Sequence, residues 1–71
     1  MNSIVITGWR PGMEKVSLTM FLRTVLDMSL SDSARITLAV LDGQEQLLHL
    51  PDHISVEDAA KYLNEIGVIA E

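Results

Sequence analysis

Short β-branched runs and longer segments with helical apolar spacing alternate along the chain. Residues 3–7 form the first run, Ser-Ile-Val-Ile-Thr, and predict a strand that ends at Gly8. Residues 8–12 predict a loop, because Pro11 has no amide hydrogen to donate and Gly12 tolerates a positive φ. The chain is therefore expected to open with a strand followed by a tight loop.

Residues 13–27 predict a helix with two apolar faces. At 100° per residue, one broad face collects most of the large apolar side chains, and we expect this face to pack on the sheet. It consists of Leu18, Phe21, Leu22, Val25 and Leu26. The opposite side, where a surface helix normally carries polar residues, has a smaller apolar strip. This strip consists of Met13, Val16 and Met20, beside Thr19 and Arg23. Either another helix covers it or it docks a partner.

Residues 29–50 have two interpretations. As a helix that opens with Ser29 and Asp32 in an approximate capping box, residues 30–41 would be largely buried and would stop at Gly43. As a strand, part of this segment shows an alternation of apolar and other residues. The Asp-Gly pair at 42–43 lies between two apolar runs, which is a strong hairpin signal. The alternating residues are Ile36, Leu38 and Val40. The pattern by itself favours the hairpin.

The last third of the chain has clearer signals. Residues 45–50 predict a strand and residues 51–54 a turn. Ser55 is a good N-cap for a helix over 56–66, which would bury one apolar stripe and stop at Gly67. That stripe is Ala59, Tyr62, Leu63 and Ile66, and a short terminal strand follows at Val68, Ile69 and Ala70. Without a linker or an internal repeat, residues 1–71 are expected to form a single domain.

Composition narrows the classes of function. The 71 residues include 48% hydrophobic residues, enough for a core, and no cysteine, which excludes disulfides, zinc-thiolate sites and thiol nucleophiles. The net charge of −5 argues against a nucleic-acid partner. No apolar run approaches the roughly 20 residues of a membrane span, and the N-terminus lacks a secretory signal, so we expect a cytoplasmic protein with no membrane partner.

The charge is unevenly distributed. Residues 1–35 carry four basic and three acidic side chains, whereas residues 36–71 carry one basic and seven acidic side chains. An acidic half keeps a small protein in solution. The weakly basic half, with Lys15 and Arg23 on one helix, is instead suited to an acidic partner.

Two motifs partly match known ligand-binding motifs, one for phosphate and one for a metal ion. Gly8, Gly12, Lys15 and Ser17 follow a strand, but a phosphate-binding loop needs its lysine directly after the second glycine. His49 and His53 flank Asp52, but His-x-x-x-His aligns two imidazoles only on a helix, and Pro51 breaks any helix here. Neither a metal site nor a cofactor site is therefore expected, and no catalytic constellation is visible.

Residues spread along nearly the whole chain resemble the C-terminal domain of the bacterial ribosomal stalk protein. The distinctive matches are Gly12, Lys15, Val16, Leu18, Leu22, Arg23, Leu30 and Asp32, continued by Ser55, Asp58 and Ala59. In that family residues 30–41 would be a helix, against the hairpin interpretation. The resemblance thus implies β-α-α-β-α-β, an α+β fold with a three-stranded antiparallel sheet and helices on one face. The alternative is a ferredoxin-like βαββαβ fold.

The resemblance also implies a site. Stalk proteins recruit translational GTPases through the exposed face of the first helix, and Lys15, Val16 and Arg23 match that face. Thr19 and Met20 stand where an isoleucine and a lysine are usual, and Ala34 stands where the second helix usually has a lysine. The stalk's dimerisation region and hinge are missing, so the chain looks like a stand-alone relative of the domain.

The Clp protease N-end-rule adaptor is similar in fold, but Thr7, Gly8, Trp9 and Leu41 replace its pocket residues. We therefore predict a non-catalytic module without a cofactor. It binds another protein through the first helix, by way of Lys15, Val16, Thr19, Met20 and Arg23. The alternatives are an adaptor-like peptide-binding protein, a self-associating homodimer, and a metal-dependent enzyme using His49, Asp52 and His53.

Overall fold

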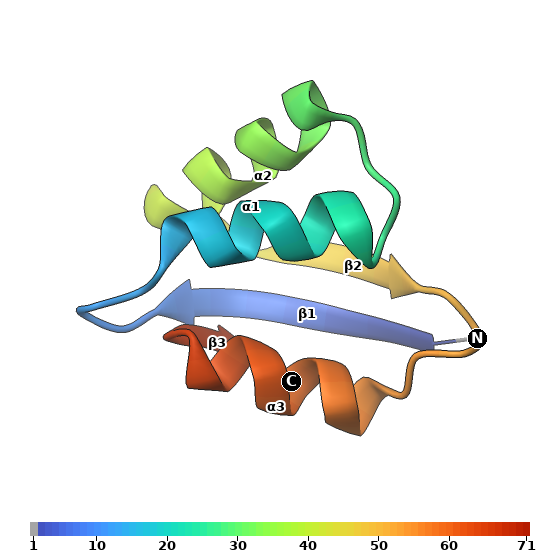
Figure 1. The fold of residues 1–71 in the computed structure, drawn as a ribbon. Coiled ribbons are helices and arrows are strands. Elements are labelled where there is room, and N and C mark those ends of the chain that lie inside the picture. Colours follow the sequence, from blue (N-terminus) through green and yellow to red (C-terminus); the bar gives the residue numbers. More distant parts are fainter. Residues whose placement is uncertain (1) are drawn as a thin grey trace.

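The computed structural model describes residues 2–71 and has the order β-α-α-β-α-β (Figure 1). The elements are β1 (Asn2–Trp9), α1 (Lys15–Thr24), α2 (Leu30–Leu41), β2 (Gln46–Leu50), α3 (Val56–Glu65) and β3 (Val68–Ala70). β1 is the central strand and pairs antiparallel with β2 on one side and β3 on the other. The α+β fold with a three-stranded antiparallel sheet is therefore confirmed.

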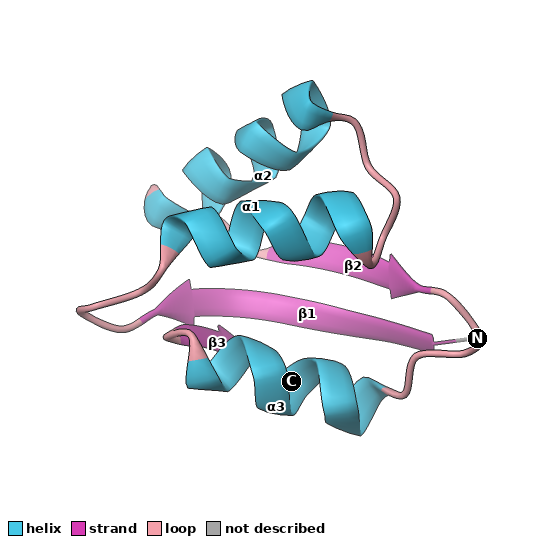
Figure 2. Ribbon diagram, in the orientation of Figure 1, coloured by secondary structure: helices cyan, strands magenta, loops and turns pink. Residues whose placement is uncertain are grey.

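Only one face of the sheet is buried. Side chains alternate between the two faces of a strand, so every second residue points to the core. The buried residues on the three strands are Ile4, Ile6, Leu48, Leu50, Val68 and Ala70. The three helices lie on this side of the sheet (Figures 1 and 2). The alternate residues of the strands point to the opposite face of the sheet, which we call the open face. They are Ser3, Val5, Thr7, Leu47, His49 and Ile69.

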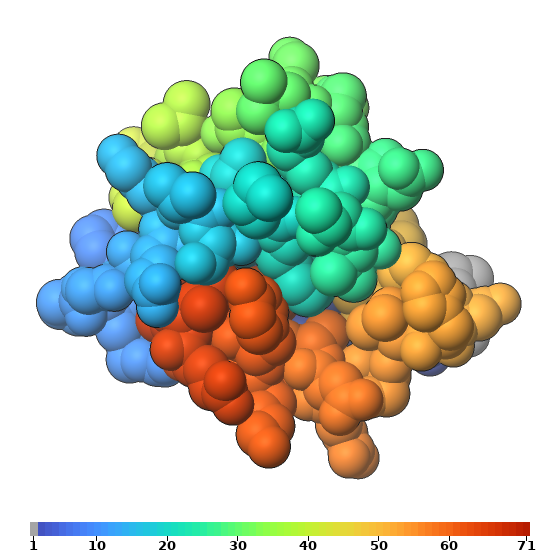
Figure 3. Space-filling model, in the orientation of Figure 1, coloured from blue at the N-terminus to red at the C-terminus, as the bar shows by residue number. Residues whose placement is uncertain are grey.

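The helices close over the sheet by burying one stripe each. α1 contributes Leu18, Phe21 and Leu22, as its apolar spacing predicts. Figure 3 shows α1 and α3 in contact across the surface, and here the rings of Phe21 and Tyr62 stack with centroids 5.4 Å apart. Burial of these side chains is the main stabilising term of the fold.

The hairpin interpretation of residues 36–50 is wrong, because residues 30–41 are helical. The Ser29 side chain accepts a hydrogen bond from the Asp32 amide at 3.1 Å and caps the first turn. The residues that α2 buries are Ser33, Ile36, Thr37 and Val40, which have helical rather than alternating spacing. Leu38 lies on the opposite, exposed side. Gly43, with φ of 85°, ends the segment where the hairpin turn was predicted.

The bounds of α1, the position of Trp9 and the exposure of Tyr62 also differ from the sequence predictions. α1 spans Lys15–Thr24 rather than 13–27, and Met13 packs against the core instead of continuing the exposed strip. Trp9 belongs to β1 rather than to a loop, and its indole N–H donates to the Leu41 carbonyl at 3.2 Å. Tyr62 is 40% exposed because its ring covers Phe21 from outside.

Gly67 fixes where α1 begins. Its φ is 92°, and a Cβ atom at this position would lie 2.8 Å from the Cα atom of Met13. The carbonyl of Gly67 accepts from the Arg10 amide at 2.8 Å, and the carbonyl of Ile66 accepts from the Glu14 amide at 2.9 Å. These bonds join the loop before α1 to the end of α3, and they therefore position the first turn of α1.

Candidate functional site

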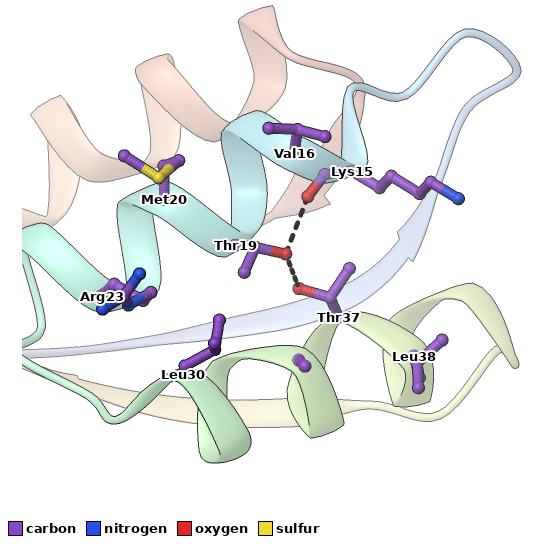
Figure 4. Close-up of a pocket in the computed structure, with 9 residues that line it drawn as sticks. Lys15, Val16, Thr19, Met20, Arg23, Leu30, Thr37 and Leu38 are labelled. Carbon is purple, nitrogen blue, oxygen red and sulfur yellow. Dashed lines mark hydrogen bonds between the residues drawn. The ribbon is translucent and has the colours of Figure 1, made fainter.

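A groove of about 320 Å³ runs between α1 and α2 on the surface (Figure 4). We call it the α1–α2 groove. It is lined by Lys15, Val16, Thr19, Met20 and Arg23 of α1 and by Leu30, Ala34, Thr37 and Leu38 of α2. The first five are the residues that the sequence predicts as a partner-binding face, and the structure places all five along this groove.

Exposed apolar side chains form the walls. Val16 and Met20 lie one turn apart on α1, and Leu30 and Leu38 lie two turns apart on α2, with Ala34 between them. These four large side chains are between 50% and 71% exposed. Single exposed apolar residues are ordinary on a protein surface, but a cluster from two elements marks an interaction site.

Two threonines, Thr19 and Thr37, form the floor of the α1–α2 groove (Figure 4). The Thr19 hydroxyl donates to the Lys15 carbonyl at 2.9 Å, and its oxygen lies 2.8 Å from the Thr37 hydroxyl oxygen. Since a hydroxyl has one hydrogen, Thr37 is the donor in the second bond. The chain of two hydrogen bonds ties α2 to α1 and uses both hydroxyl hydrogens, which leaves the floor without a free donor.

The charge of the groove is positive. Lys15 and Arg23 lie at its edge, and none of its lining residues is acidic. Within residues 2–71 the ion pair found is Arg35 with Asp32, so Lys15 and Arg23 have no carboxylate partner in the described chain. Lys15 also occupies the first turn of α1, where the helix dipole disfavours a cation. The position of Lys15 thus does not stabilise the helix.

From the α2 half of the groove, sequence reasoning named Ala34 beside the predicted site but missed Leu30, Thr37 and Leu38 as lining residues. Leu30, Ala34 and Leu38 recur every four residues, which is a helical stripe opposite the buried one. The signal was present, but it has meaning only once residues 30–41 are known to be helical and adjacent to α1. Thr37 could not be predicted as a floor residue, since its role depends on contact with Thr19.

The other candidate residues are not brought together. His49 lies on the open face at the end of β2, and Asp52 and His53 follow in the turn, all of them exposed. Among residues 2–71 no three His, Asp or Glu side chains are grouped so that they could hold a metal ion. Over the same residues, no helix is long and apolar enough to cross a membrane.

Comparisons of the chain with protein-family models, with curated proteins and with solved structures give no match. The site therefore has to be interpreted from its own geometry and chemistry.

Proposed function

We propose that the protein is an interaction module whose α1–α2 groove binds an amphipathic, acid-bearing segment of another protein. The observation that carries the proposal is the pairing of apolar walls with two unpartnered cations. Apolar contacts would supply the binding energy, and carboxylates of the partner would meet Lys15 and Arg23.

The spacing of the cations specifies the partner further. Lys15 and Arg23 are eight residues apart on α1, which corresponds to about 12 Å along the helix axis. A partner helix that packs alongside α1 would match them with two carboxylates placed seven or eight residues apart. Apolar side chains between these carboxylates would enter between Val16 and Met20 on one wall and Leu38 on the other.

The chemistry of the lining supports binding rather than catalysis at this groove. The lining set contains no carboxylate, imidazole or thiol, and the two threonine hydroxyls bond to each other and to the backbone. A polar metabolite would find few groups to orient it, because specific small-molecule pockets need several convergent polar groups. Apolar side chains of a protein segment fit such a surface better.

The resemblance to the stalk domain supports the same face and suggests a class of partner. In the stalk family this face recruits translational GTPases, so a translation factor is the first partner to test. The replacements of lysine by Met20 and Ala34 make the groove more apolar and less basic than the family pattern, while Thr19 in place of isoleucine adds one hydroxyl. We therefore expect apolar contacts to contribute more here than they do in the family.

Met20→Glu tests the groove. A suitable probe is a fluorescent helical peptide with leucines at helical spacing and two glutamates eight residues apart. Because Met20 is half exposed, we expect the variant to stay folded with little change in melting temperature. Anisotropy titration should show at least tenfold weaker binding, because the substitution places a carboxylate among apolar contacts.

Lys61→Glu is the control for overall charge, since it introduces a carboxylate on α3, away from the groove, and lowers the net charge by two where Met20→Glu lowers it by one. It should bind the probe nearly as well as the unmodified chain. A loss in Lys61→Glu as large as that in Met20→Glu, or larger, would show that overall charge rather than the groove governs binding. Unfolding of Met20→Glu would show that Met20 is a core residue, and halving of the particle mass would show a homodimer interface instead.

A further inference from the structure

The two edge strands of the sheet differ in the hydrogen bonds that their outer backbone groups make. At the β3 edge, the side-chain amide of Asn64 donates to the Ala70 carbonyl at 3.3 Å. α3 thus covers part of the backbone that would otherwise face outward. At the β2 edge, formed by Gln46–Leu50, no hydrogen bond within residues 2–71 reaches the backbone except those of the ladder to β1.

The register shows which groups of β2 face outward. The Val5 amide donates to the Glu71 carbonyl at 2.9 Å, and the Glu71 amide returns the bond to Val5 at 3.0 Å, so the backbone groups of Val5 point toward β3. Leu47 is opposite Val5 on the other side. In an antiparallel ladder hydrogen-bonded and non-hydrogen-bonded pairs alternate. The N–H and C=O of Leu47, and of His49 two residues on, therefore point to the free edge.

Nothing in β2 itself blocks pairing with another strand. Natural proteins protect an edge with lysine, proline or a bulge. Residues 46–50, Gln-Leu-Leu-His-Leu, contain no lysine and no proline, and they pair with β1 in unbroken register. Leu47 is 58% exposed on the open face.

Two antiparallel copies of the segment around Leu47 would place complementary side chains opposite each other. Leu47 and His49 of β2 are two residues apart and lie on the same face, and Glu45, directly before β2, joins that face when the pairing extends the strand by one residue. In an antiparallel pair of two copies centred on Leu47, each Leu47 lies opposite the other. Each His49 then lies opposite Glu45 of the second copy, where an imidazole N–H can donate to the carboxylate.

We propose that two copies of the chain associate through their β2 edges in this register. The pairing joins three strands from each copy into one continuous antiparallel sheet. Its two-fold symmetry makes the contact self-complementary and closed, so it stops at a dimer. The contact uses no residue of the α1–α2 groove and is therefore independent of the proposed function.

Amide hydrogen exchange at two protein concentrations tests the contact directly. At about 10 μM the Leu47 and His49 amides should exchange freely, because they face solvent. At about 1 mM they should become protected while the sedimentation mass rises toward twice that of the chain. Gln46, Leu48 and Leu50 are internal controls, since their amides bond to β1 and should be protected at both concentrations. Free exchange of Leu47 and His49 at the higher concentration would overturn the proposal.

Substitutions that reverse the charges of Glu45 and His49 test the register of the proposed β2–β2 pairing. His49→Glu places a carboxylate opposite Glu45 of the second copy, twice in each dimer, and this like-charge pairing should weaken dimerisation roughly tenfold. The double variant Glu45→Lys with His49→Glu restores an opposite-charge pair and should recover dimerisation to within a few-fold. A dimer unchanged by His49→Glu, or one abolished by Met20→Glu instead, would refute the β2 contact.

Discussion

At the scale of single residues, α2 contains two buried hydroxyls in opposite situations. Thr37 is almost fully buried and donates to Thr19, whereas the Ser33 hydroxyl is fully buried and has no hydrogen-bond partner among residues 2–71. A buried polar group without a partner loses its hydration and gains nothing in return. The two residues lie one turn apart on the same face of the same helix, so they allow a matched comparison.

Ser33→Ala is expected to raise the free energy of unfolding by about 1 kcal/mol, because it removes an unsatisfied hydroxyl and improves helix propensity. Thr37→Val is expected to lower it by about 1 kcal/mol, because it keeps the shape and removes a satisfied hydroxyl. Chemical denaturation measures both. A change of stability in the same direction in both variants would contradict the difference in hydrogen bonding between Ser33 and Thr37.

At the scale of elements, most boundaries could be predicted because caps and breakers are local signals. Ser55 accepts a hydrogen bond from the Asp58 amide at 3.0 Å, and α3 begins where that cap predicts. The same local logic failed at residues 36–40. Alternation of Ile36, Leu38 and Val40 fits a strand only if all three side chains face one side. In α2 Leu38 points away from the other two, toward the groove, and the Asp-Gly pair ends a helix instead of turning a hairpin.

The resemblance to the stalk domain predicted α2 where the residue pattern did not. A hairpin signal and a helix C-terminus use the same residue, since both need glycine at positive φ. What distinguishes them is tertiary contact: α2 packs on α1 and on β1, so its buried side is decided by neighbours that lie elsewhere in the sequence. For the same reason the α2 half of the groove could not be predicted from spacing alone.

The junction between α3 and the loop before α1 gives a prediction at this scale. Gly67→Ala is expected to lower the free energy of unfolding by about 3 kcal/mol, through a positive φ and a clash with the Met13 backbone. Gly12→Ala is the control, because Gly12 has the same φ of 92° and nothing within 4 Å of an added Cβ. It should cost about 1 kcal/mol, the cost of the backbone conformation alone. Equal effects in thermal or denaturant unfolding would contradict a close contact at Gly67.

At the scale of the whole molecule, the charge of the α1–α2 groove is opposite in sign to the net charge of the chain. The chain carries a net charge of −5, yet the α1–α2 groove has cations and no carboxylate. The sheet covers its core with three helices on one face and leaves the other face and the β2 edge open. Under the two proposals, the protein offers two separate surfaces, the groove for an acidic partner segment and the β2 edge for its own copy.

The central claim is that the α1–α2 groove is the partner-binding surface. The most direct measurement is a two-dimensional ¹H–¹⁵N NMR titration of the labelled chain with the unlabelled acidic amphipathic helical peptide. The account predicts that amide shifts concentrate on the groove residues of α1 and α2, while α3 and the open face stay unchanged. Replacing the peptide's two glutamates by glutamines should weaken the same shifts without moving them elsewhere. Shifts concentrated on the open face or α3, or no shifts at millimolar peptide, would contradict the account.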